Sequence, residues 1–134
     1  MTSRPIQPSW LTRVVLDAIH TDQIREHGGL LGLRDETGLE SALARPQHQW
    51  LYEPVTDLAS LGAAYAFGLT QNHPYNDGNK RVALVAMLTF LAINGQDIGA
   101  DEDDVLTTML ALAAGRLSES ELASWLRARM VRTQ

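Results

Sequence analysis

Apolar residues recur every three or four positions along most of the chain, the spacing that places them on one face of a helix. In the first such segment, Ser9 is suited to cap a helix that runs to about Glu26 and stops at the glycine pair 28–29. Helical spacing returns over residues 36–45. This second helix is expected to end before Pro46, because the residue that precedes a proline disfavours the helical conformation.

Two strongly apolar segments lie in the middle of the chain. Asp57 is a good cap for a helix over residues 58–72, and another helix is predicted over residues 79–93, closed by the Asn-Gly pair at 94–95. Because these segments are the most apolar, we expect the two helices to be the most buried and the loop at 73–78 to join them.

Shorter segments complete the pattern. Two more helices are expected near the C-terminus, over about residues 103–114 and after the capping box at 118–121, and the tail beyond Met130 is expected to fray. Residues 28–35 are glycine-rich and apolar but too short for a helix, which favours an exposed flap or hairpin. Because no strands alternate with helices and no linker divides the chain, the sequence predicts one all-α domain over residues 1–134. This domain is expected to be a compact helical bundle with a short flap.

Composition narrows the range of functions. The chain of 134 residues has no cysteine, which excludes disulfides, zinc–thiolate sites and a thiol nucleophile. Its net charge of −5 disfavours direct binding to nucleic acid, because proteins that neutralise many phosphates are usually basic. The first ten residues lack the apolar core of a secretion signal, and the longest apolar-rich stretch, 82–93, is far shorter than the ~20 residues of a membrane span. We therefore expect a cytoplasmic protein that does not bind a membrane.

The loop at 73–78 and the start of the next helix hold residue types that suit phosphate binding. Backbone N–H groups at a helix start have no intrahelical partner, and together with the helix dipole they attract an anion. Gly78 lets the backbone approach a phosphate closely, and Asn79 adds a side-chain donor. Lys80 and Arg81 add two cations, which oppose the helix dipole unless an anion is bound.

Two other side chains of this loop suit the transfer of a phosphate-containing group. Asp77 offers a hard oxygen ligand for a magnesium ion that bridges nucleotide phosphates. His73 could accept the proton of an attacking hydroxyl near neutral pH. Each residue taken alone has a simpler explanation, as a structural histidine, a turn or a solvated cation. Their joint occurrence within nine residues favours phosphoryl or nucleotidyl transfer.

The segment from His73 to Arg81 resembles the signature of the Fic/Doc family, His-x-Phe-x-Asp/Glu-Gly-Asn-x-Arg. Lysine between the asparagine and the arginine is similar to the death-on-curing (Doc) branch of toxins, and the similarity covers roughly residues 17–128. Tyr75 stands in place of the phenylalanine, so its hydroxyl needs a partner or an exit to water. The resemblance implies that His73 is the general base and that Asp77 is a ligand of Mg²⁺. It also implies that Gly78 and Asn79 form an anion hole. Lys80 and Arg81 would contact the phosphates.

Two positions bear on the reaction. Fic AMP-transferases have glycine where this chain has Lys80, and a second arginine where it has Leu84. The resemblance to the Doc branch therefore implies a kinase that uses ATP, or another nucleoside triphosphate, and Mg²⁺ to phosphorylate Ser or Thr of a target protein, with elongation factor Tu as the family's known target. The alternatives are an AMP-transferase and a non-enzymatic partner of a DNA-binding antitoxin.

The resemblance also implies partners and a means of restraint. The flap at 28–35 would dock the target, with Arg34 either recognising it or forming an ion pair and helix cap with Asp35. Fic proteins are restrained by a helix in which a glutamate precedes glycine or asparagine, and this sequence has no such pair. A separate antitoxin is therefore the implied inhibitor, with a disordered segment that folds onto an exposed apolar groove. Nucleic acid would be reached only through that antitoxin.

Overall fold

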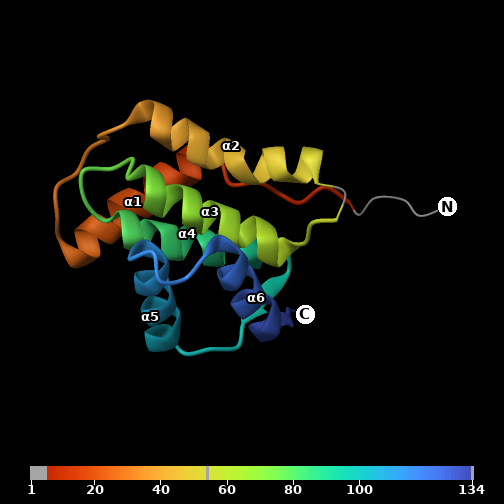
Figure 1. Cartoon of the computed structure of the whole chain (residues 1–134). Coiled ribbons are helices and arrows are strands. Elements are labelled where there is room, and N and C mark those ends of the chain that lie inside the picture. The colour runs from red at the N-terminus through yellow and green to blue at the C-terminus, as the bar shows by residue number, and fades with distance from the viewer. Residues whose placement is uncertain (1–5, 54, 134) are drawn as a thin grey trace.

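A computed structural model describes residues 6–53 and 55–133, and these form six helices and one two-stranded sheet (Figure 1). The helices are α1 (Arg13–His27), α2 (Glu36–Tyr52), α3 (Leu58–Asn72), α4 (Asn79–Ile93), α5 (Glu102–Ala113) and α6 (Glu119–Arg129). The strands are β1 (Gln96–Ile98) and β2 (Met130–Arg132). The predicted all-α class is confirmed. The first five residues of the polar N-terminal segment lie outside the described part of the chain.

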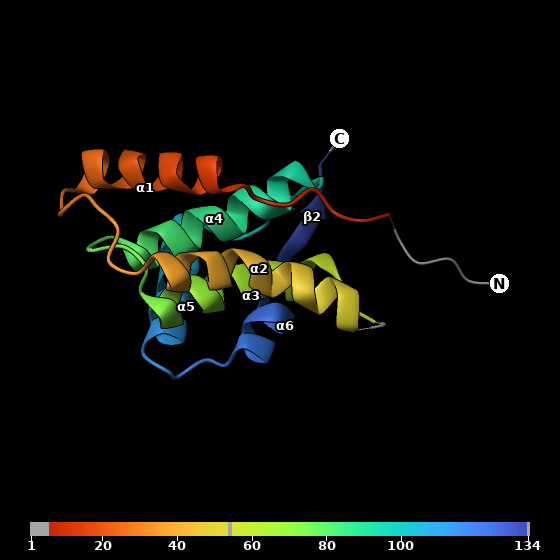
Figure 2. The same ribbon diagram turned by 90° about the horizontal axis from the view of Figure 1, so that it is seen from above.

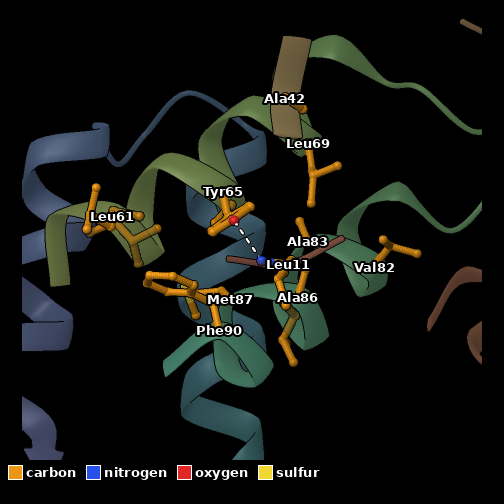
Figure 3. Close-up of a cluster of buried hydrophobic side chains, with 14 of the residues drawn as sticks. Leu11, Ala42, Leu61, Tyr65, Leu69, Val82, Ala83, Ala86, Met87 and Phe90 are labelled. Atoms are coloured by element: carbon orange, nitrogen blue, oxygen red, sulfur yellow. Dashed lines mark hydrogen bonds between the residues drawn. The ribbon is translucent and has the colours of Figure 1, made fainter. Parts of the chain in front are cut away.

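The two apolar helices α3 and α4 form the centre of the bundle, as their composition predicts. Figure 2 shows α4 between α1 and α3, and α2 and α6 pack on α3. Side chains of α3 and α4 meet in a core where Tyr65 and Phe90 are fully buried, with ring centroids 5.0 Å apart (Figure 3). Gly68 lets α2 approach closely, since a Cβ atom there would lie 3.3 Å from the Cβ of Ala42.

The second helix is longer than the sequence predicts. It continues through Pro46 to Tyr52, so the expected end before Pro46 is wrong. A proline inside a helix removes one backbone hydrogen bond and crowds the preceding turn. Burial offsets this cost, because Pro46 is buried and so is Trp50, one turn later. The rings of Trp50 and Trp10 meet edge to face, with centroids 6.5 Å apart.

The first helix starts later than predicted, at Arg13, and its cap is Thr12 rather than Ser9. The Thr12 hydroxyl accepts the Val15 N–H. Ser9 instead pairs with Asn94: its N–H donates to Asn94 Oδ1 at 2.8 Å, and the Asn94 amide donates to its carbonyl at 2.9 Å. The Ser9 prediction failed because this partner lies 85 positions away in the sequence.

The C-terminal tail is ordered into a strand, so the expectation of a frayed tail is wrong. β2 pairs antiparallel with β1, with Val131 opposite Asp97. The pairing continues at Thr133, whose N–H donates to the Gly95 carbonyl at 2.9 Å. Among the described residues, no helix is both long and apolar enough to span a membrane.

The caps of α3 and α6 are the ones that the sequence predicts. Asp57 accepts the Ser60 N–H at 2.9 Å, and Ser118 forms a reciprocal capping box with Glu121. Asp57 also receives two hydrogen bonds from Arg127 of α6, at 2.7 and 3.1 Å. The Arg127 guanidinium and the Ser60 N–H lower the pKa of Asp57 to about 2. This carboxylate therefore both begins the central helix and ties it to α6.

We expect the stability that Asp57 provides to depend on pH. Because its folded pKa lies below the value of about 3.9 in an unfolded chain, its charge stabilises the fold above about pH 4. That stabilisation is lost as the pH falls towards 2. Asp57→Ala should lower the free energy of unfolding by about 1–2 kcal/mol at pH 7, measured by urea unfolding, because it removes the cap and an exposed ion pair.

Asp57→Asn is the matched control, since asparagine caps helices as well as aspartate but carries no charge. It should lose less stability than the alanine variant at pH 7. If its free energy of unfolding falls between pH 4 and pH 2 as steeply as that of the unmodified protein, the charge of Asp57 is not the cause.

Candidate active site

The segment singled out in the sequence is the loop between α3 and α4, and it brings the expected site residues together at one end of the bundle. Both views place the flap beside this loop (Figures 1 and 2). His73 ends α3 in the left-handed conformation, with φ of 49° and ψ of 54°. A residue other than glycine rarely adopts this conformation, so surrounding contacts must hold His73 in place.

Arg34 of the flap provides those contacts. Its guanidinium donates to the His73 carbonyl at 2.7 Å and to the Asn72 carbonyl at 2.9 Å. These carbonyls belong to the end of α3, where a helix leaves its acceptors unpaired. Asp35 caps α2 by accepting the Gly38 N–H at 2.9 Å. The expected helix cap at Asp35 is therefore present, whereas no ion pair joins Arg34 to Asp35 within the described residues. A role of Arg34 in recognising the target stays a prediction.

The backbone of the flap is also joined to the loop. The N–H groups of Arg34 and Asp35 both donate to the Pro74 carbonyl, at 2.7 and 3.0 Å. The Asn76 N–H donates to the Gly32 carbonyl at 3.0 Å. Residues 28–35 thus form an extended, mostly exposed segment, as predicted, and the segment runs along the edge of the loop.

Asn79 is buried, and its side chain organises the loop from within. Its Oδ1 accepts the Tyr75 N–H at 2.9 Å, and its Nδ2 donates to the Tyr75 carbonyl at 2.9 Å and to His73 Nδ1 at 2.8 Å. Both amide hydrogens therefore have acceptors in the protein. The side-chain donor expected for an anion is engaged, which leaves the backbone N–H of Asn79 for that purpose.

The contact with Asn79 also determines which ring nitrogen of neutral His73 carries the proton. An amide nitrogen can only donate, so Nδ1 of His73 is the acceptor and the neutral ring carries its proton on Nε2. For Nε2 to accept a proton from a hydroxyl, the ring proton must move to Nδ1 and the contact with Asn79 must break. In the arrangement shown here, the ring is held in place but is not yet in the form of a base.

The start of α4 offers a set of free donors. The backbone N–H groups of Gly78, Asn79, Lys80 and Arg81 have no acceptor within the described residues, and no side chain caps the helix. Lys80 is exposed and Arg81 is half-buried, and neither forms an ion pair in the part of the chain that the structure describes. Unpaired N–H groups next to two free cations are the donor set that a phosphate group requires.

Asp77 lies exposed on the same loop, with one carboxylate oxygen engaged. Its Oδ2 accepts the Leu30 N–H of the flap at 2.7 Å, and its Oδ1 has no hydrogen bond in residues 6–53 and 55–133. No group of three potential metal ligands occurs among the described residues. A magnesium ion at Asp77 would therefore need its remaining ligands from water and from nucleotide phosphates, as this ion usually does.

Helix α1 supports the loop from behind, through residues that sequence reasoning missed. Tyr75 donates its hydroxyl to Asp17 at 2.9 Å, which supplies the partner that its burial requires; burial and this bond raise the pKa of Tyr75. His20 is buried, stacks on the Tyr75 ring with centroids 3.8 Å apart, and lies 3.0 Å from the Asp77 carbonyl through Nε2. The signal in the sequence was the spacing of three between Asp17 and His20, which places both side chains on one face of α1.

The chain is similar to one known family and to two named proteins. The Fic/DOC family model matches residues 10–91, which include the flap, the loop and most of α4. The chain is 36% identical over 112 residues to the protein kinase doc of Escherichia phage P1, a match that covers 84% of this chain and 88% of that protein. It is 43% identical over 77 residues to the toxin Doc of Mycolicibacterium smegmatis, covering 57% of this chain and 59% of that protein.

Proposed function

The chain belongs to the Fic/Doc family. We propose that it is the toxin of a toxin–antitoxin module and that this toxin phosphorylates a target protein. Its substrates would be ATP, or another nucleoside triphosphate, with Mg²⁺, and a Ser or Thr hydroxyl of the target. The observation that carries the proposal is the group of unpaired N–H donors at residues 78–81, beside two cations and the fixed ring of His73. The names of the two relatives, a protein kinase and a toxin, support it.

The residues of the loop divide the work between binding and proton transfer. The N–H groups at 78–81, with Lys80 and Arg81, hold phosphate oxygens, and Asp77 contributes to holding Mg²⁺, which would offset the charge of the phosphates. The target hydroxyl oxygen forms a bond to the γ-phosphorus while the bond from that phosphorus to the ADP oxygen breaks. The hydroxyl proton passes to the ring of His73, once the ring has a free lone pair facing the substrate.

The choice of a kinase over an AMP-transferase rests on two residues. Lys80 adds a cation beside the phosphate donors, and Leu84 replaces the second arginine that helps Fic AMP-transferases to hold the far phosphates. Leu84 is almost fully buried and lines an apolar groove with Val85 and Leu88, and its side chain carries no charge that could hold a phosphate. A triphosphate held mainly by residues 78–81 would present its γ-phosphate to the target.

Labelled ATP separates the two reactions. The protein is incubated with Mg²⁺, a bacterial lysate and ATP that carries its label on either the α- or the γ-phosphate. We expect a protein band labelled from the γ-position alone. Label transferred from the α-position alone would establish the AMP-transferase and rule out the kinase. Purified elongation factor Tu in place of the lysate tests the proposed target, and its failure to become labelled would direct the search to other proteins.

The role of Asp77 in holding Mg²⁺ gives a separate prediction. Asp77→Asn should raise the Mg²⁺ concentration for half-maximal transfer at least about tenfold, since loss of even indirect metal partners commonly costs that much. Asparagine keeps the size of the side chain and an oxygen that can accept the Leu30 N–H, so the flap contact can persist. The measurement is transfer rate against Mg²⁺ concentration. Asp22→Asn, an exposed carboxylate on α1, is the control, and an equal effect of both variants would contradict the assignment.

We propose an antitoxin as the partner that restrains this activity. An apolar groove of about 500 Å³ runs along the outer face of α4, between the start of α5 and β1. Val85, Leu88 and Ile98 line it, and Glu102 and Asp97 lie at its edge. An antitoxin segment with apolar side chains flanked by basic residues would complement this surface.

A further inference from the structure

The peptide bond between Asp77 and Gly78 is fixed in orientation by a histidine of α1. The Asp77 carbonyl oxygen lies 3.0 Å from Nε2 of His20, and a carbonyl can only accept, so His20 is the donor. No cis peptide occurs in the described residues, and in a trans peptide the carbonyl and the following N–H point in opposite directions. With the Asp77 carbonyl directed at α1, the Gly78 N–H points away from α1.

Among the described residues, no other hydrogen bond fixes this orientation. Gly78 adopts a φ of 81° and has no Cβ, so its own sterics permit the preceding peptide to face either way. The unpaired N–H groups of the first turn of α4 supply no bond that would decide between the two orientations. Within the described residues, the Asp77 carbonyl accepts a hydrogen bond from His20 and from no other group.

His20 is in turn held rigidly. The residue is 4% exposed, and its ring lies nearly parallel to that of Tyr75, with an interplanar angle of 9° and centroids 3.8 Å apart. Tyr75 is anchored at its far end by Asp17, which also receives a hydrogen bond from Arg13 at 2.9 Å. Ile24, one turn further along α1, lies against Gly78. One face of α1 thus forms a rigid support for the loop.

We propose that His20 is a positioning residue that directs the Gly78 N–H towards the bound phosphate. The inference rests on the phosphate site proposed above. Without the His20 donor, the Asp77–Gly78 peptide can turn over and present a carbonyl oxygen to the phosphate, which replaces an attraction by a repulsion. His20 does not touch the nucleotide, and it acts only through this peptide.

Two variants separate the hydrogen bond from the ring stacking. His20→Phe keeps a ring against Tyr75 but has no donor, whereas His20→Gln keeps an N–H donor without the ring. We expect His20→Phe to raise the Kd for Mg-ATP by about ten- to a hundredfold, the effect of a hydrogen bond to a charged group. His20→Gln should recover most of the affinity. His48→Phe, at an exposed histidine of α2 whose ring meets that of Tyr52 edge to face, should bind like the unmodified protein.

The amide resonance of Gly78 in ¹⁵N-labelled protein is the second readout, because a purely structural role would not change its response to Mg-ATP. It should shift on addition of Mg-ATP in the unmodified protein and fail to shift in His20→Phe. If His20→Phe binds Mg-ATP as tightly as the unmodified protein, or if folded His20→Gln binds as weakly as His20→Phe, the inference is overturned while the phosphate site stands. If the unmodified protein itself does not bind Mg-ATP, the proposed function fails and the inference fails with it.

One measurement needs no variant and so does not depend on how well a variant folds. The ¹⁵N resonances of the His20 ring in the unmodified protein should show a proton on Nε2. A neutral ring that carries its proton on Nδ1 instead would contradict the hydrogen bond to Asp77 and overturn the inference.

Discussion

Replacement of His73 by alanine is expected to lower the rate of phosphate transfer by about 10²–10⁴-fold, the usual contribution of a general base. The fold should change little, because the side chain of His73 is exposed and its one hydrogen bond is to the Asn79 amide. Affinity for Mg-ATP should stay close to that of the unmodified protein, since the donors at residues 78–81 remain. The measurement is the rate of transfer from γ-labelled ATP, together with growth of cells that express the variant.

The growth assay also tests the alternative that this protein acts without catalysis. A protein whose effect depends only on pairing with a DNA-binding antitoxin should inhibit growth equally well without His73. Full growth inhibition by His73→Ala would therefore support the non-enzymatic reading and exclude the proposed mechanism. His48→Ala is the matched control, because it removes another exposed histidine, one on α2 and away from the loop.

Replacement of Asn79 by alanine is expected to have the largest effect on the loop itself. It leaves the N–H and the carbonyl of Tyr75 without their partners, and Tyr75 is buried. Each unpaired buried group costs about 1–3 kcal/mol, so we expect the loss of both partners to lower the free energy of unfolding by about 2–6 kcal/mol. The ring of His73 also loses its contact at Nδ1. Urea unfolding measures the first effect, and the rate of phosphate transfer in the folded variant measures the second.

Asn76→Ala is the matched control in the same loop. Asn76 is exposed, and its side chain donates a single hydrogen bond of 3.3 Å to the Leu31 carbonyl. Its loss should cost less than about 1 kcal/mol. Equal destabilisation by the two substitutions would show that the burial and the three hydrogen bonds of Asn79 do not determine the stability of this loop.

Much of the fold could be predicted because helix ends are encoded locally. The bounds of α3 and α4, the cap at Asp57 and the capping box at Ser118 each depend on residues within one turn of the helix end. The central position of α3 and α4 also followed from their apolar composition. For these elements, local signals and the packing of the whole chain favour the same structure.

The predictions that failed depend on residues far apart in the sequence. Pro46 remains within α2 because it and Trp50 are buried, and Ser9 is engaged by Asn94 rather than by the first turn of a helix. The C-terminal tail is a strand because β1, more than thirty residues earlier, offers it a partner. No local pattern contains that information, since burial and pairing are fixed only when the helices pack.

The site divides in the same way. The free N–H groups and the two cations at the start of α4 could be predicted, because they belong to one helix start; phosphate binding there stays a prediction. The geometry could not, because it is set by other elements: Arg34 holds His73 from the flap, and His20 holds Asp77 from α1. The sequence also could not show that the Asn79 side chain is engaged within the loop, which leaves its backbone N–H for an anion.

The most direct test of the proposed kinase activity is mass spectrometry of the target modified in the presence of this protein, ATP and Mg²⁺. We expect a single modified Ser or Thr residue that carries one phosphate group, and no modification when His73→Ala replaces the unmodified protein. A target residue that carries AMP would contradict the kinase activity. So would the finding that this protein inhibits growth while every peptide of the target stays unmodified.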